Sequence, residues 1–311
     1  MGLLDVLPWR RDKKAVSLAD DDLFDDEFQR KLEYLALVSR RVFAGRLRAE
    51  RRTKKSGSGV EFADHRDYQP GDDFRYLDWN VYQRFEKLLV RLYEEEEDLA
   101  IYFILDTSAS MAFGDARKLR YAKKVCAALA YVGLANLDRV SIVTTSDHVM
   151  ERMPETRGKA RIFKAFRFLR GVNAEGTTDL GDAMKTFVAQ NKRRGLAVLV
   201  SDLYDPRGFE RGINILRYNK FDPFLVHVTD PSEGKPKLNG DVLVYDCETG
   251  DEREVTVTAK VLTRFAEAYA GYLADIDRFC GTHQVPYVTA SVDVAFDELI
   301  LRVFRRGGFL R

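Results

Sequence analysis

Three short segments of this 311-residue chain combine carboxylates with small hydroxyl side chains. The first is Asp106-Thr107-Ser108-Ala109-Ser110, where alternation directs Asp106, Ser108 and Ser110 to one side of a loop. Carboxylate and hydroxyl oxygens are hard ligands, suited to Mg²⁺, which prefers octahedral oxygen coordination and keeps bound waters. Alone, this segment is weak evidence for a metal site, because Asp and Ser also cap helix N-termini.

Two later segments supply the remaining ligand types. Gly176-Thr177-Thr178-Asp179-Leu180 stands before an expected helix, and Ser201-Asp202 follows an apolar run that is typical of a buried strand. Ligands of doubly wound sheets bind where the strands end at their carboxyl side. We therefore expect the three loops to converge on one site.

The combination of D-x-S-x-S with a later Thr and a later Asp resembles the metal-ion-dependent adhesion site (MIDAS) of the von Willebrand factor A family. The resemblance assigns five metal residues, which are Asp106, Ser108, Ser110, Thr178 and Asp202. It implies direct bonds from the two serines, a direct or water-mediated bond from the threonine, and largely water-mediated contacts from the two aspartates. Thr178 is chosen because Thr178-Asp179-Leu180 fits the family's Thr-x-apolar spacing, and Thr177 stays open as an alternative.

The same resemblance implies how the site works. A Mg²⁺ ion, or Mn²⁺ or Ca²⁺ in its place, is bound directly by few carboxylates, so it stays electrophilic and accepts an acidic side chain from a partner protein. The expected function is thus metal-dependent protein binding without catalysis. Whether Asp115, Asp179 or Ser201 assist the site is left open.

A second resemblance covers nearly the whole chain. It is carried by Gly57-x-Gly59-x-Glu61-Phe62, then Asp64-x-Arg66-x-Tyr68-x-Pro70-Gly71-Asp72-Asp73, then Asp78-Trp79. These motifs are similar to those of the bacterial family called domain of unknown function fifty-eight. That family resembles partners of MoxR-type AAA+ ATPases, so the resemblance implies an adaptor or co-chaperone that helps such an ATPase act on client proteins.

The order of the expected elements predicts the fold class. Strand-like and helix-like segments alternate, which predicts an α/β fold with a doubly wound, mostly parallel six-stranded sheet and helices on both faces. Strand patterns occupy residues 88–92, 99–105, 140–144, 196–200, 224–228 and 285–290. The segment 241–258 is typical of an inserted β-hairpin.

Composition shifts suggest three parts. We expect a flexible, charged segment over residues 1–26, a helix with a polar, loop-rich extension over 27–85, and a von Willebrand factor A-like domain over 86–311. The stretch 60–84 is dense in Asp, Arg, Tyr and Trp and predicts a loop fixed by paired polar side chains. Its role, structural or interfacial, stays open.

Composition also narrows the partners and the compartment. The net charge of +1 gives no global field toward nucleic acid or membrane. The three cysteines form no CxxC pair, and no apolar run approaches the roughly 20 residues that span a bilayer, so we expect a cytoplasmic protein. Peripheral membrane contact through residues 1–9 stays open. The alternative function is nucleic-acid or anion binding through the basic segment 40–55.

Enzymatic alternatives lack their required groups. Asp106 resembles the nucleophile position of haloacid dehalogenase-like phosphatases, but these need a second acid two residues on, where this chain has Ser108. No G-x-S-x-G elbow and no G-x-x-x-x-G-K-[ST] loop occurs. We therefore expect no enzymatic activity and no small-molecule substrate.

Overall fold

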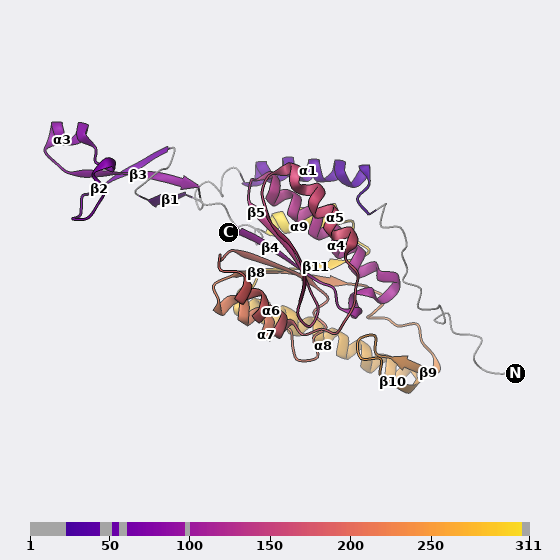
Figure 1. Cartoon of the computed structure of the whole chain (residues 1–311). Helices are drawn as coiled ribbons and strands as arrows, with labels where there is room; N and C mark the ends of the chain where they lie inside the picture. The colour runs from indigo at the N-terminus through magenta and orange to yellow at the C-terminus, as the bar shows by residue number, and fades with distance from the viewer. Residues whose placement is uncertain (1–22, 44–51, 56–60, 97–99, 307–311) are drawn as a thin grey trace.

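A six-stranded sheet forms the centre of the molecule. The structure is a computed structural model, and it describes residues 23–43, 52–55, 61–96 and 100–306 (Figure 1). The sheet has the strand order β11-β8-β7-β4-β5-β6, and all neighbours are parallel except β5 and β6. Its strands are β4 (Ala100–Asp106), β5 (Arg139–Thr145), β6 (Val149–Thr156), β7 (Leu196–Ser201), β8 (Asp222–Thr229) and β11 (Tyr287–Ser291).

Helices cover both faces of this sheet, because successive side chains of each buried strand point to opposite faces. On β4, Ile101, Phe103 and Leu105 join the core on one face, whereas Tyr102 and Ile104 join the core on the other. The first face is covered by α1 (Asp26–Phe43), α4 (Phe113–Ala135), α5 (Ile162–Gly171) and α9 (Phe296–Arg306). The second is covered by α6 (Leu180–Gln190), α7 (Glu210–Tyr218) and α8 (Ala259–His283) (Figure 1).

This architecture confirms the predicted fold class, including the inserted hairpin. The hairpin consists of β9 (Gly240–Tyr245) and β10 (Glu252–Val257), and it lies between β8 and α8. Figure 1 shows the hairpin beside α8.

A second, smaller sheet stands apart from the central one in Figure 1. Its strand order is β1-β3-β2, with β1 (Arg52–Lys55), β2 (Glu61–Asp67) and β3 (Leu89–Glu96), all antiparallel. A 3₁₀ turn, η2 (Phe74–Tyr76), and the short helix α3 (Trp79–Phe85) connect β2 to β3.

Ion pairs hold the connection between β2 and β3, as the Asp- and Arg-rich sequence predicts. Asp78 accepts hydrogen bonds from the first backbone N–H groups of α3 and also bonds His65 at 3.0 Å and Arg91 at 3.1 Å. Arg66 makes a bidentate pair with Asp72. The guanidinium and imidazole groups thus fix a segment that has no apolar period of its own.

The strand membership expected from the sequence is wrong at two places. The pattern at residues 88–92 belongs to β3, which pairs with β1 and β2 in the small sheet and not with β4. The sixth place in the central sheet is taken by β6, which pairs only with β5 and contains Pro154. An edge strand can contain proline because one of its sides forms no hydrogen bonds with a neighbouring strand. Most of β6 is also exposed, so its sequence lacks the apolar alternation that predicts a strand.

The described residues also bear on the expected N-terminal parts. Leu23 and Phe24 are buried, and Phe24 stacks on Phe166 of α5. The packed part of the chain therefore begins before residue 27, where the helix and the polar extension are expected to start. Most of the expected flexible segment 1–26, and residues 44–51 and 56–60 of the basic and glycine-rich stretch, lie outside the described residues. Within the described residues, no helix is long and apolar enough to span a bilayer.

Candidate metal centre

Backbone hydrogen bonds join the loops that carry the candidate residues. The loop after β4 and the loop before α6 are tied by Ala109 N–H to Gly176 C=O at 3.0 Å and by Glu175 N–H to Thr107 C=O at 2.7 Å. The loop after β7 is tied to the start of α6 by Leu180 N–H to the Asp205 carboxylate at 2.8 Å. The carboxyl-side edge of the sheet therefore brings together segments that are far apart in the sequence, as expected for a doubly wound sheet.

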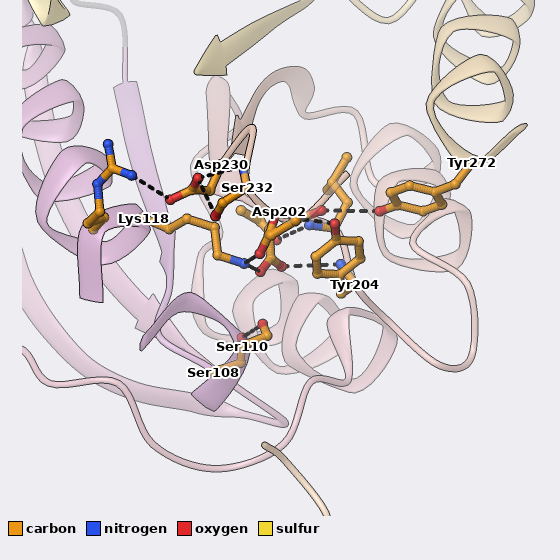
Figure 2. Close-up of polar contacts among 12 residues, drawn as sticks. Ser108, Ser110, Lys118, Asp202, Tyr204, Asp230, Ser232 and Tyr272 are labelled. Atoms are coloured by element: carbon orange, nitrogen blue, oxygen red, sulfur yellow. Dashed lines mark hydrogen bonds and ion pairs between the residues drawn. The ribbon is translucent and has the colours of Figure 1, made fainter. Parts of the chain in front are cut away.

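The five predicted residues are all buried, with exposed fractions between 0 and 6%. Asp106 ends β4, and its two carboxylate oxygens accept from Ser108 N–H at 2.9 Å and from the Ser201 hydroxyl at 2.5 Å. The hydroxyl oxygens of Ser108 and Ser110 lie 3.0 Å apart (Figure 2). Two adjacent ligands of an octahedral ion with bonds of about 2.1 Å are separated by about 3.0 Å, so the serine pair fits Mg²⁺.

Asp202 lies at the other side of this group and is engaged by a buried lysine. Its Oδ2 accepts from Lys118 Nζ at 2.7 Å, and its Oδ1 accepts from Tyr204 N–H at 3.2 Å (Figure 2). Lys118 Nζ also contacts Glu233 at 2.5 Å. Burial lowers the pKa of Lys118, but the attraction of the two carboxylates outweighs burial and the pKa is raised. Lys118 is thus a fixed cation inside the site.

Thr178 is engaged by a residue from the inserted hairpin. Its hydroxyl donates to Glu248 Oε1 at 2.6 Å and its backbone N–H donates to Glu248 Oε2 at 2.9 Å. Thr178 is buried, whereas the alternative Thr177 is exposed. Thr178 is therefore the one of the two threonines for which the structure gives a contact with a carboxylate, that of Glu248.

Negative charge exceeds positive charge around these side chains. Burial, together with the neighbouring Asp202, raises the pKa of Asp106 to about 7. Lys118 pairs with the carboxylates of Asp202 and Glu233, and the carboxylate of Asp106 interacts with that of Asp202, so three carboxylates surround one cation. A divalent cation would favour the ionised form of Asp106 and balance the remaining charge.

The five predicted residues offer three hydroxyl groups and two carboxylates. Within the part of the chain that the structure describes, no group of three or more His, Cys, Asp or Glu side chains is placed to hold a metal ion. The hydroxyls of Ser108, Ser110 and Thr178 are hard oxygen ligands, of the kind that Mg²⁺ or Mn²⁺ accepts.

The sequence did not reveal three participants, which are Lys118, Glu233 and Glu248. None of them belongs to the metal-site motif. Lys118 comes from α4, directly after the loop of the serines, whereas Glu233 and Glu248 come from segments far along the chain. Of the three residues left open, Ser201 bonds Asp106, and Asp179 caps α6 and pairs with Arg207. Asp115 is exposed in the first turn of α4.

Comparisons with solved structures return proteins of low sequence identity. One is BatB, a conserved hypothetical protein from Bacteroides thetaiotaomicron, with a TM-score of 0.43 and 14% identity, covering 67% of this chain and 98% of that protein. Another is proximal thread matrix protein 1 from the mussel byssus, with a zinc-occupied MIDAS motif. It has a TM-score of 0.37 and 14% identity, covering 68% of this chain and 46% of that protein.

Comparisons of sequence give relatives in mycobacteria. Uncharacterized proteins of Mycobacterium bovis and Mycobacterium tuberculosis are each 27% identical over 267 residues, covering 84% of this chain and 84% of the relative. An uncharacterized protein of Mycobacterium avium is 31% identical over 115 residues, covering 37% of this chain and 68% of the relative. The family described as "Protein of unknown function DUF58" matches residues 64–272, and the chain belongs to that family.

Proposed function

We propose that the protein is a metal-dependent protein-binding module, in which Asp106, Ser108, Ser110, Thr178 and Asp202 hold one Mg²⁺ ion. The observation that carries the proposal is the pair of buried serine hydroxyls 3.0 Å apart beside two buried carboxylates. When bound, the metal supplies an electrophilic centre for a carboxylate of the partner.

The protein's own groups prepare this site. Ser108 N–H and the Ser201 hydroxyl fix both oxygens of Asp106, which orients the carboxylate toward the serine pair. Lys118 neutralises part of the charge of Asp202. Fewer net negative charges leave the metal more electrophilic, and this favours capture of a further carboxylate from outside.

The proposal is for binding and not for catalysis. Asp106 stands at the position of a phosphatase nucleophile, but both of its oxygens accept hydrogen bonds from the fold. The acid that such a phosphatase needs two positions further on is replaced here by Ser108.

The partner class follows from the sequence motifs. We propose a MoxR-type AAA+ ATPase, or its client, as the protein that offers the acidic side chain, with this chain acting as the adaptor. The motif from Asp64 to Asp78, which carries part of this resemblance, lies in β2 and in the connection to β3, and Figure 1 shows these elements apart from the central sheet. The two regions could thus engage two proteins at once.

Calorimetric titration of the EDTA-treated protein with Mg²⁺ and with Mn²⁺ tests the metal site. We expect one saturable site in the parent, and none in a Ser108→Ala/Ser110→Ala variant that keeps the parent's circular dichroism. Ser146→Ala, which removes a buried hydroxyl from the neighbouring loop, is the matched control and should bind like the parent. Equal binding by the double variant, or none by the folded parent, would refute the proposed site.

The partner is tested separately by capture of a purified MoxR-type ATPase on the immobilised chain. Retention in Mg²⁺ and release in EDTA are expected, with no retention by the double variant. Retention that is indifferent to EDTA and falls steeply with salt would point instead to charge-driven binding.

A further inference from the structure

The β9–β10 hairpin brings a carboxylate into contact with the candidate metal centre. Glu248 lies in the turn of this hairpin, 70 positions from Thr178 in the sequence. Each of its carboxylate oxygens accepts one hydrogen bond from Thr178, at 2.6 Å from the hydroxyl and at 2.9 Å from the backbone N–H. Glu248 thus makes a two-point contact with one of the proposed metal ligands.

The turn is constructed to hold Glu248 in place. Asp246 accepts from Glu248 N–H at 2.8 Å and from Thr249 N–H at 3.1 Å. The backbone bonds Gly250 N–H to Asp246 C=O and Asp246 N–H to Asp251 C=O, both 2.9 Å, close the turn. Gly250 has φ +76°, a conformation that glycine adopts without strain. These contacts reduce the conformational entropy that Glu248 loses when it binds Thr178.

The hairpin also lines a cavity that reaches Ser110. A cavity of about 540 Å³ is lined by Ser110 and Lys118 from the site and by Val244 and Cys247 from the hairpin, with α8 as its other wall. Cys247 is the residue directly before Glu248. The turn therefore contacts Thr178 through Glu248 and shares a cavity with Ser110 through Cys247.

We infer that Glu248 is an internal carboxylate ligand of the metal centre, and that an acidic side chain of a partner must displace it. The inference rests on the proposed function. Glu248 offers the same chemical group as the expected partner, and an intramolecular competitor acts at an effective concentration in the millimolar range. The free protein therefore keeps its adhesion site closed, and only a partner that also displaces the hairpin binds well.

The test uses acetate as the carboxylate probe and Mn²⁺ as the metal, on the 311-residue chain. Paramagnetic relaxation of ¹³C-acetate by the Mn²⁺-loaded protein reports acetate at the metal. We expect Glu248→Gln to bind acetate about tenfold more tightly than the parent, because the competing carboxylate is gone. Glu254→Gln removes the same charge from an exposed position of β10 and should behave like the parent.

A second readout needs no metal. The Thr178 amide donates to Glu248, so its hydrogen exchange should be slow in the parent and clearly faster in Glu248→Ala, with Glu254→Ala unchanged. If Mn²⁺ binds but acetate relaxation and Thr178 exchange are the same in parent and variants, Glu248 is not an internal ligand and the adhesion site stands. If no variant and no parent binds Mn²⁺, the adhesion site itself fails and the inference fails with it.

Discussion

The ammonium of Lys118 lies 2.7 Å from the carboxylate of Asp202, and both side chains are buried. Lys118 belongs to α4, and Asp202 follows β7, the strand next to β4. The pair therefore connects the helix that begins near the serines to the end of β7. A buried ion pair contributes little net stability when intact, but removing one partner is strongly destabilising. Lys118 therefore sets both the stability and the charge of the site.

Lys118→Met should show this double role in unfolding experiments. In EDTA we expect the free energy of unfolding to fall by about 3–5 kcal/mol, because the buried Asp202 and the partly buried Glu233 lose their cation. Saturating Mg²⁺ should recover more stability in the variant than it adds to the parent, since the metal then meets more negative charge. Urea unfolding with and without Mg²⁺ measures both effects. Lys124→Met, on the same helix, is the control, and an equal Mg²⁺ effect in Lys118→Met and parent would contradict the expectation.

Ser201→Ala tests the orientation of Asp106. The Ser201 hydroxyl donates to Asp106 and accepts from Leu203 N–H at 2.8 Å, so it fixes the carboxylate without being a proposed ligand. Loss of such a supporting bond typically costs 10- to 100-fold in metal affinity, and we expect a decrease of about this size for Mg²⁺. Calorimetry measures it. Ser141→Ala, which removes another buried strand hydroxyl, should leave the affinity unchanged.

Asp78 gives the small sheet a pH dependence of predictable sign. Hydrogen bonds from His65 and then from Arg91 hold the pKa of Asp78 well below its usual range. A depressed pKa means that the carboxylate stabilises the fold above the unfolded-state value, about 3.9, and that this contribution is lost as the pH falls toward the folded-state pKa. The free energy of unfolding of the parent should therefore decrease below about pH 4. Asp78→Asn should have a lower free energy of unfolding at neutral pH and should lose less of it on acidification.

Tryptophan fluorescence can follow this transition. Trp79 begins α3 directly after Asp78, and a Trp9→Phe background removes the second of the chain's two tryptophans. Asp67→Asn, an exposed carboxylate in β2, is the matched control. Parallel acid profiles of the parent and Asp78→Asn would show that the Asp78 network adds nothing to stability.

Gly195 is a position where the sheet allows no side chain. A Cβ atom there would lie 2.1 Å from the backbone oxygen of Ala100, at the start of the strand that carries Asp106. Backbone cannot move as a flexible side chain does, so Gly195→Ala should destabilise the protein by about 3 kcal/mol or more. At Gly171 a Cβ meets nothing within 4 Å, so Gly171→Ala should be neutral or slightly stabilising. Comparison of the two melting temperatures checks the pair.

The sequence predicted the parts that depend on local patterns. Asp106, Ser108 and Ser110 lie within one loop, and the buried strand before them has a continuous apolar run, so motif and strand are visible together. The doubly wound topology then explains why the loops before α6 and after β7 meet that motif. These features follow from short-range sequence and one general rule of sheet geometry.

The parts that sequence did not predict depend on long-range contacts. Lys118 contacts Asp202 across 84 positions of the sequence, and Glu248 contacts Thr178 across 70. The sequence around each residue does not indicate its partner. The edge strand β6 is equally inconspicuous, because its exposed side tolerates polar residues. The residues 88–92 show a strand pattern, but the pattern does not specify with which sheet it pairs.

The direct succession of β3 and β4 gives the molecule a mechanical property. β3 ends at Glu96 and β4 begins at Ala100, so one of the two covalent paths by which a tensile load on the small sheet can reach the α/β body enters at the first residue of a central strand. β4 is hydrogen-bonded to β5 on one side and to β7 on the other. The hydrogen bonds from β4 to β5 and β7 lie perpendicular to a load along β4. They therefore carry the load together, in shear, and do not break one after another. Asp106 is at the far end of β4, so a load that enters at Ala100 is distributed over the hydrogen bonds on both sides of the strand before it reaches the candidate metal centre.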